Sequence, residues 1–319
     1  MKTETAKKVK TVNGKQRSSQ KITPCLWFDD QAKEAATFYT SLFKNARIGT
    51  TTHYGKEGYE IHGQPEGRVM TVEFEIEGFQ FVGLNGGPHF KFTPAISFFV
   101  LCESTNQVDS LWNKLAKGGQ ALMPLDKYDW SEKYGWIQDK FGLSWQLMVA
   151  QDKITPKIIP SLMFVGDQAG NAEEAIHFYT HVFKDSSVGQ IARYGPGQEP
   201  DKEGTIMYAD FTLKNQRFAA MDSAQDHQFN FNEAVSLTIN CDTQEEVDYY
   251  WQKLSAVPEA EQCGWLKDKY GVSWQVSPTV LQKMMSDSDQ KKVDRVMKAF
   301  LQMKKFDIKK LKKAFEEKN

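Results

Sequence analysis

Several features that would place this chain in a familiar class are missing from its sequence. The 319 residues contain four cysteines, and no two of them form a C-x-x-C pair, which argues against a disulfide scaffold. No apolar run approaches the roughly 20 residues that a membrane-spanning helix needs. The first 21 residues lack the apolar centre of a secretory signal. These absences predict a soluble cytoplasmic protein with no membrane partner.

Two of the cysteines are predicted to be structural. Cys102 and Cys241 each follow an apolar, strand-like run, SFFVLC and SLTINC. A cysteine in such a place behaves as a small buried hydrophobic residue. Cys25 and Cys263 have no partner at a metal-ligand spacing.

Basic charge is concentrated at the two ends of the chain. Residues 1–21 and residues 283–319 each carry a net charge of +6, so the 261 residues between them carry −13. A nucleic-acid groove needs basic charge on a folded face, so no nucleic-acid partner is expected. Residues 1–20 are predicted to form a disordered basic tail.

Common cofactor-binding and hydrolase motifs are also missing. We find no phosphate-binding P-loop, no dinucleotide fingerprint and no Gly-x-Ser-x-Gly elbow. The glycine-containing stretch YGPGQEPDKEG at 194–204 is interrupted by prolines and leads into a strand-like run instead of a helix. The sequence therefore predicts no cofactor.

The chain contains an internal duplication. KFGLSWQL at 140–147 matches KYGVSWQV at 269–276, and other similar segments occur in the same order in both halves. They pair KITPCLWF with KIIPSLMF, EAATFYTSLF with EAIHFYTHVF, AISFFVLCE with AVSLTINCD, VDSLWNKL with VDYYWQKL, and GWIQDKFG with GWLKDKYG. Ordered self-similarity of this kind marks a tandem repeat.

Hydrophobic periodicity predicts an α+β fold for each repeat. In the first, strands are expected at 22–28, 69–77, 79–84, 96–102 and 143–149, and helices at 31–43 and 104–115. Residues 118–135 are expected to form a loose segment. The run 69–77 alternates apolar and polar residues, so one face of the sheet packs on helices and the other is partly polar.

Two curved sheets, one from each repeat, are expected to enclose a cavity with their partly polar faces. Gln146 and Gln275 would then lie mid-strand on the cavity side. The predicted ligand pocket comprises Thr23, Thr71, Glu73, Ser97, Phe99, Gln146, Tyr208, Asp210, Ser236 and Gln275.

The motifs ITPCLWF, FYTSLF, AISFFVLCES…VDSLWNKL and GW…DKFGLSWQ resemble the PhnB-like, 3-demethylubiquinone-9 3-methyltransferase-like branch of the vicinal oxygen chelate superfamily. Glyoxalase I, bleomycin-resistance proteins and extradiol dioxygenases belong to this superfamily. The resemblance implies paired βαβββ modules forming cupped, mixed sheets. It assigns a first module to 21–151, a second to 152–278, and a helical extension to 279–319.

Metal-dependent members of the superfamily hold a divalent metal with His and Glu on the cavity-facing strands. Carried over by position across modules, the ligand sets become Thr23, Thr71, Ser236, Gln275 and Ile159, Tyr208, Ser97, Gln146. Neither set contains a histidine or a carboxylate, which transition metals prefer. The favoured hypothesis is therefore a metal-free protein that binds a small molecule.

Two alternatives remain open. The first is a metal-dependent lyase, isomerase or dioxygenase that uses Glu73 or Asp210, the candidate catalytic residues. The second is an interaction factor that acts through the basic ends. The pair His177 and His181 has helical metal-binding spacing, but a solvated helix face is the favoured interpretation.

The remaining signals concern the tryptophans and the C-terminal segment. Trp27 and Trp130 have no match in the other repeat and could line a pocket. The segment after residue 285 is predicted to form two helices, capped by the Ser/Asp run at 286–289 and by Asp307. Their apolar stripes predict docking on the chain's own domain, with a homodimer as the alternative.

Overall fold

The computed structural model describes residues 20–150 and 157–317. The first repeat contains β1 (Ile22–Phe28), α1 (Ala32–Leu42), β2 (Ala46–His53), α2 (Tyr59–His62), β3 (Val69–Ile76), β4 (Phe79–Asn85), β5 (Ile96–Cys102), α3 (Thr105–Leu115), β6 (Gln120–Tyr128), β7 (Ser131–Gln138) and β8 (Ser144–Val149). The predicted tail at 1–20 lies outside the described residues except for Gln20, as does the module boundary at 151–152.

The second repeat contains β9 (Ile158–Phe164), α4 (Ala172–Val182), β10 (Ser187–Arg193), β11 (Ile206–Leu213), β12 (Gln216–Asp222), β13 (Val235–Cys241), α5 (Gln244–Leu254), β14 (Trp265–Lys267) and β15 (Ser273–Pro278). Three helices follow: α6 (Thr279–Met285), α7 (Gln290–Phe300) and α8 (Ile308–Glu316). None of the helices in the described ranges is long and apolar enough to cross a membrane.

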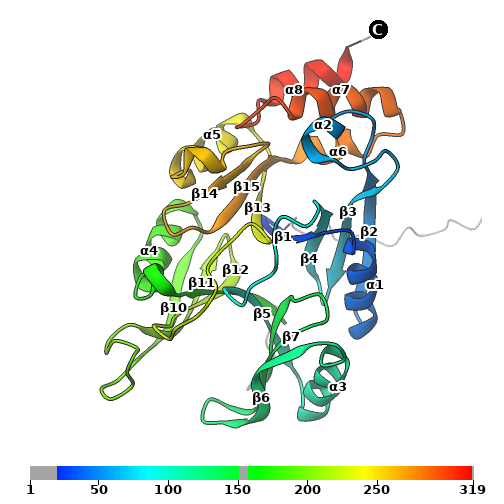
Figure 1. Ribbon diagram of the computed structural model, residues 1–319. Coiled ribbons are helices and arrows are strands. Elements are labelled where there is room, and N and C mark those ends of the chain that lie inside the picture. The colour runs from blue at the N-terminus through cyan, green and yellow to red at the C-terminus, as the bar shows by residue number, and fades with distance from the viewer. Residues whose placement is uncertain (1–19, 151–156, 318–319) are drawn as a thin grey trace, which may run out of the picture.

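Each sheet is assembled from both repeats, which corrects the expectation of one sheet per repeat. The seven-stranded sheet has the order β14-β15-β13-β1-β4-β3-β2, and the eight-stranded sheet has the order β10-β11-β12-β9-β5-β8-β7-β6. The exchange occurs where β1 pairs antiparallel with β13 and where β5 pairs antiparallel with β9. Figure 1 shows the two sheets side by side, with strands of both repeats in each.

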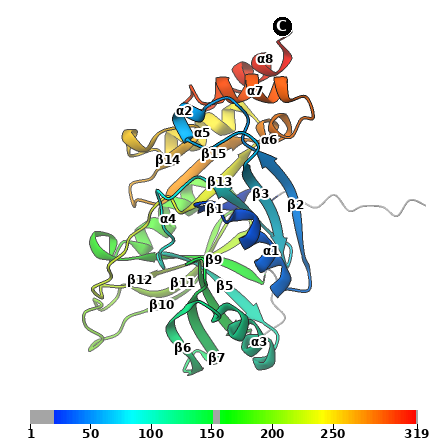
Figure 2. The same cartoon turned by 45° about the vertical axis from the view of Figure 1, so that its right-hand side comes forward.

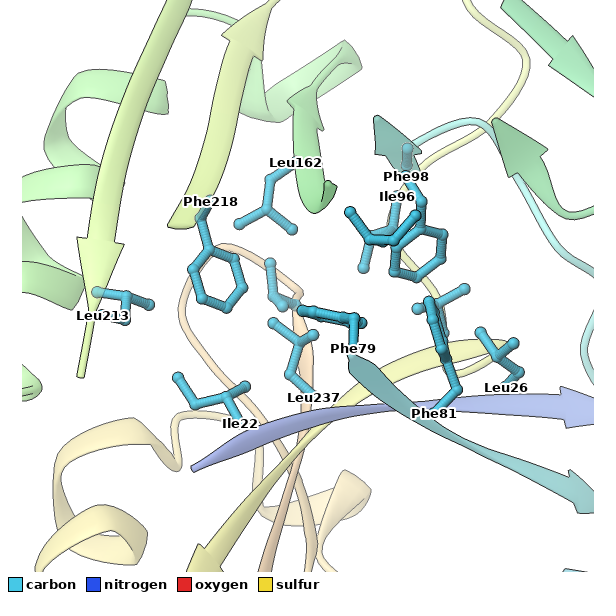
Figure 3. Packing of buried hydrophobic residues seen from close by; sticks show 14 of the residues in the cluster. Ile22, Leu26, Phe79, Phe81, Ile96, Phe98, Leu162, Leu213, Phe218 and Leu237 are labelled. Carbon is cyan, nitrogen blue, oxygen red and sulfur yellow. The ribbon is translucent and has the colours of Figure 1, made fainter. Parts of the chain in front are cut away.

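A hydrophobic core fills the space between the two sheets. Phe79 and Phe81 of the seven-stranded sheet lie in the same buried cluster as Phe98 and Phe218 of the eight-stranded sheet. Figure 3 shows these side chains pointing toward one another. Burying an aromatic or aliphatic side chain of this size contributes about 1.5–3 kcal/mol. The prediction of a cavity between the sheets is therefore wrong. The apolar faces of the two sheets meet there, and their mixed faces point away from each other.

The repeated octapeptide follows a buried aspartate. The carboxylate of Asp268 accepts hydrogen bonds from Trp274 Nε1 at 2.8 Å and from the Tyr179 hydroxyl at 2.7 Å. In the first repeat, Asp139 accepts from Trp145 Nε1 at 2.8 Å. Burial raises the pKa of both carboxyls, that of Asp268 to about 6. The tryptophan of each octapeptide thus belongs to the core, whereas its lysine is exposed and its serine and glutamine point to the opposite face of the sheet.

Two predicted boundaries need correction. Residues 46–53, to which no element was assigned from the sequence, form β2 at the edge of the seven-stranded sheet. The segment 118–135, expected to be loose, contains β6 and the start of β7. Both pairings are irregular: register shifts interrupt the β2–β3 and β6–β7 ladders. Bulges of this kind break the strict alternation by which a strand is recognised in a sequence.

The second repeat lacks a hairpin of the length of β6–β7. On the side of β15 away from β13, the described chain forms the three-residue β14, and the segment between α7 and α8 occupies the adjoining place. The Met303 carbonyl accepts from the Cys263 amide at 2.8 Å, and the Lys304 carbonyl accepts from the Gly264 amide at 2.7 Å. Phe306 packs over Gly264, where a Cβ atom would lie 2.4 Å from its ring.

The C-terminal helices form a small bundle at one end of the molecule, beside α2 (Figures 1 and 2). As predicted, Asp289 and Asp307 cap α7 and α8 with their side chains. Val296, Phe306 and Leu311 are buried in a cluster that is separate from the main core. The helix α6 was not anticipated from the sequence.

Candidate functional site

The ten predicted pocket residues separate onto two surfaces. We call the side of the seven-stranded sheet that faces away from the core the A face, and the corresponding side of the eight-stranded sheet the B face. The A face carries Thr23, Cys25, Thr71, Glu73, Ser236, Thr238, Asn240, Gln275 and Ser277. The B face carries Ser97, Phe99, Leu101, Gln146, Met148, Ile159, Ser161, Tyr208 and Asp210. The two cross-module sets expected from the sequence lie on these separate faces.

The A face is built around a neutral hydrogen-bonded group. Gln275 Nε2 donates to Ser236 Oγ at 2.9 Å, and both residues lie beside the Cys25 thiol. Asn240 Nδ2 donates to Thr23 Oγ1 at 3.1 Å on the same face. Burial raises the pKa of Cys25 to about 11, so its thiol stays protonated and is not a thiolate nucleophile.

The B face repeats the glutamine–serine pair in apolar surroundings. Gln146 Nε2 donates to Ser97 Oγ at 2.8 Å, while Gln146 Oε1 accepts from the Tyr134 hydroxyl at 2.6 Å. Phe99 and Tyr208 meet edge to face, with ring centroids 6.1 Å apart. Burial raises the pKa of both Tyr134 and Tyr208, so their hydroxyls are neutral hydrogen-bond donors at ordinary pH.

The two candidate catalytic carboxylates bind the irregular edge strands. Asp210 accepts from the Gln190 amide at 2.5 Å and pairs with Arg217 at 3.3 Å. Glu73 accepts from the Thr50 amide at 3.4 Å and from the side chain of Gln282 in α6. Both amides lie where the ladder of an edge strand shifts its register. Each carboxylate therefore occupies a structural position at a β-bulge.

The chemistry of these donor sets does not fit a divalent transition metal. Hydroxyl, amide and aliphatic side chains occupy the matched positions on both faces, and the amides bond to neighbouring serines. Over residues 20–150 and 157–317, no three His, Cys, Asp or Glu side chains lie close enough together to hold a metal. His177 and His181 lie on the exposed side of α4, in agreement with the solvated-face interpretation.

The two unmatched tryptophans lie beside different faces. Trp27 donates from Nε1 to the Gly87 carbonyl at 2.8 Å and meets Trp265 edge to face at 5.9 Å. Trp130 lies between β6 and β7, is 52% exposed, and stacks on Tyr128 at 4.9 Å. Each therefore belongs to an aromatic group next to one of the two predicted sets.

Two hollows of the described surface lie away from both glutamine–serine pairs. One of about 1160 Å³ is lined by α8 and nearby residues, including Asp248, Lys305 and Phe306. The other, of about 580 Å³, is lined by Lys44, Glu75, Lys157 and their neighbours. Neither contains any of the ten predicted pocket residues, so the location of the pocket stays a prediction.

The polar residues of the two faces that were not predicted from the sequence include Cys25, Ser161 and Tyr134. Cys25 and Ser161 occupy matched positions in β1 and β9, two residues after Thr23 and Ile159. Strand alternation places them on the same faces as those residues, so this signal was present in the sequence. Tyr134 lies in the segment that was expected to be loose, so its contact with Gln146 could not be anticipated.

Comparison with known proteins agrees with this architecture. A glyoxalase I structure from Zea mays matches 83% of this chain and 95% of its own, with a TM-score of 0.50 and 11% identity. The chain thus has the two-module fold of the vicinal oxygen chelate superfamily. The sequence model of the family described as 3-demethylubiquinone-9 3-methyltransferase matches residues 20–148 and 156–277. The chain belongs to this family and contains its unit twice.

Two further solved structures each correspond to about one repeat. A PhnB protein from Bacillus cereus is 41% identical over 41% of this chain and 100% of its own, with a TM-score of 0.38. A protein from Pseudomonas aeruginosa is 23% identical over 42% of this chain and 100% of its own, with a TM-score of 0.36. No curated protein matches this chain.

Proposed function

We propose that this protein binds a small organic molecule at the A face, the B face or both, without a metal. The supporting observation is the neutral glutamine–serine pair at matched mid-strand positions on each face. Such pairs offer directional hydrogen bonds within a rigid sheet, which is how small-molecule sites obtain specificity. A methyl-transfer activity, which the family description mentions, is not part of the proposal, because no cofactor-binding turn supports it.

The metal-dependent alternative has less support from the geometry. Both carboxylates that it would need already bind edge-strand amides, and Asp210 also pairs with Arg217. Recruiting either to a metal would remove the carboxylate from its amide, which loses a hydrogen bond worth about 0.5–1.5 kcal/mol.

Native mass spectrometry of protein purified in EDTA tests the proposal. We expect the folded chain to retain an organic adduct that is released on denaturation. The matched variants Gln146→Leu and Gln275→Leu should show which face holds it, because each removes one of the two amides.

Metal analysis of the same preparation supplies the opposing result. Zinc, nickel or manganese bound at one per chain after EDTA dialysis, and lost in either glutamine variant, would refute metal-free binding.

A further inference from the structure

The B face has a composition that the A face lacks. At five matched positions, a polar residue of the A face is replaced by an apolar or aromatic one on the B face. The pairs are Thr23 and Ile159, Thr71 and Tyr208, Thr238 and Phe99, Asn240 and Leu101, and Ser277 and Met148. The B-face members gather in a hydrophobic cluster distinct from the main core, and Tyr208 and Met148 remain partly exposed. Most of this cluster is buried, with Phe99 and Ile159 at 5% and 2% exposure, so Tyr208 and Met148 form its accessible edge.

One polar group in this apolar cluster lacks a partner. Among the described residues, two buried side-chain polar atoms have no hydrogen bond: the Tyr39 hydroxyl, which lies beside Asp139 in the core, and the hydroxyl of Ser161. Ser161 is 1% exposed and lies on β9 between Ser97 of β5 and Ala219 of β12. Strand alternation directs it to the B face, since Leu162 on the next position belongs to the core.

A buried hydroxyl without a partner is unfavourable, by an amount comparable to a lost hydrogen bond. At the matched position of the A face, the Cys25 thiol lies beside Gln275 and Ser236. On the B face, Gln146 bonds with Tyr134 and Ser97. Tyr134 comes from the β6–β7 hairpin, so the hairpin that the second repeat lacks is what supplies Gln146 with this additional partner.

Aromatic rings surround the same face. Tyr128 stacks on Trp130, and Tyr134 meets both rings edge to face, at 5.5 and 5.6 Å between centroids. The hairpin thus adds a wall of aromatic side chains. The outermost ring, that of Trp130, is half exposed. Flat aromatic walls favour a flat ligand, because stacked and edge-to-face contacts add to the gain from buried area.

We propose that the B face binds a flat, uncharged aromatic molecule whose oxygen accepts a hydrogen bond from Ser161. This inference rests on the proposed small-molecule function and specifies its face and ligand class. An oxygen acceptor would satisfy the Ser161 hydroxyl, while the ring lies against Phe99 and Tyr208. A charged ligand would lose its hydration in this apolar cluster, and the charges beside Tyr208, those of Asp210 and Arg217, already pair with each other.

The experiment uses 6-propionyl-2-dimethylaminonaphthalene, a flat, neutral, fluorescent ketone, as the probe with the full chain. We expect saturable binding, and roughly 5- to 10-fold weaker binding to Ser161→Ala, which corresponds to one hydrogen bond. The emission of the probe bound to that variant should shift to the blue, because the carbonyl loses its donor. The matched A-face variant, Cys25→Ala, should leave both affinity and emission unchanged.

Two further measurements separate a ligand role from a structural one. Ser161→Ala should not lower the melting temperature of the unliganded protein, since it removes no bond. Competition by 2-acetonaphthone should exceed competition by 2-ethylnaphthalene about 5-fold with the wild type, and this preference should disappear in Ser161→Ala.

Several results would overturn the inference. The first is the absence of saturable probe binding, and the second is unchanged probe affinity and emission in Ser161→Ala. The third is a lower melting temperature of Ser161→Ala with unchanged probe affinity, because this would indicate that buried water holds the Ser161 hydroxyl. Probe binding that is weakened by Cys25→Ala alone would refute the B-face assignment and leave the proposed function standing. Failure of the proposed function itself would appear separately, as a stoichiometric metal in the EDTA-treated protein.

Discussion

The A face and the B face are built on the same strand framework, yet they differ in polarity and in what supports them. Both contain a glutamine that donates to a serine across neighbouring parallel strands. The A face continues with hydroxyl and amide side chains and is bordered by the C-terminal helices. The B face continues with apolar and aromatic side chains and is bordered by the β6–β7 hairpin. The duplicated scaffold was kept while the chemistry of its two surfaces diverged.

The largest expected effect on stability concerns the segments that border the two faces, namely the C-terminal helices and the β6–β7 hairpin. Phe306 is 2% exposed and packs over Gly264, whereas Trp130 at the tip of the hairpin is half exposed. Phe306→Ala should reduce the free energy of unfolding by about 3–5 kcal/mol, because it leaves a cavity in the helical bundle. Trp130→Ala should cost under about 1 kcal/mol, because an exposed ring loses little burial.

Urea denaturation of the two variants checks this contrast. If Trp130→Ala proves as destabilising as Phe306→Ala, the hairpin and the helical extension contribute equally to stability, and the difference between the two borders disappears.

The next effect compares the buried aspartates of the two repeats. Because the folded pKa of Asp268 is about 6, above the 3.8 of an exposed aspartate, the folded state holds its proton more tightly than the unfolded state. This group therefore stabilises the fold at low pH, and its contribution falls as the pH rises from about 4 to about 6. Asp268→Asn should remove this decline, whose size is about 2–3 kcal/mol.

Unfolding measurements at pH 4, 5, 6 and 7 test this sign. Carboxylates with lowered pKa, such as Glu173 and Glu174, give the opposite slope, so the informative quantity is the difference between wild type and variant. Asp139→Asn is the matched control in the first repeat, where burial also raises the pKa. A difference that does not change with pH would contradict the assignment to Asp268.

The third effect tests the polarity of the faces directly. Tyr208→Thr places the A-face residue on the B face and loses the contact with Phe99, at a cost of about 1–2 kcal/mol. Thr71→Val removes a hydroxyl that lies 2.6 Å from Thr52 Oγ1, at a cost of about 1 kcal/mol. In thermal denaturation, the melting temperature of Tyr208→Thr should be lower than that of Thr71→Val. The reverse order would show that the apolar cluster adds no stability.

The sequence allowed the repeat and the α+β fold to be predicted, because each depends on local periodicity or on ordered motifs. The cross-module sets were instead implied by the family resemblance. The sequence did not allow strand exchange between the repeats to be predicted. The hydrophobic periodicity of β1 would be the same whether it paired with β13 or with a strand of its own repeat. The edge strand β2 and the hairpin were missed because their bulges break the alternation.

The roles of individual site residues were harder to predict than their faces. The alternation of apolar and polar residues correctly predicted that Glu73 and Asp210 lie on the faces that point away from the core. It could not predict their hydrogen-bond partners. Each accepts a hydrogen bond from a backbone amide some 20 residues earlier in the chain, at a bulge that the sequence does not reveal. A carboxylate predicted to face a cavity is therefore also a candidate for holding an adjacent edge strand.

The smallest effect compares these two carboxylates. Asp210→Asn weakens a short amide contact and an ion pair with a partly buried arginine, and should cost about 1–2 kcal/mol. Glu73→Gln should cost under about 1 kcal/mol, because its amide contact is longer, at 3.4 Å, and its other partner is the exposed Gln282. Hydrogen exchange at the Gln190 and Thr50 amides measures each bulge separately. If exchange at Gln190 does not accelerate in Asp210→Asn, the carboxylate does not hold the strand, and a ligand-binding role for Asp210 regains weight.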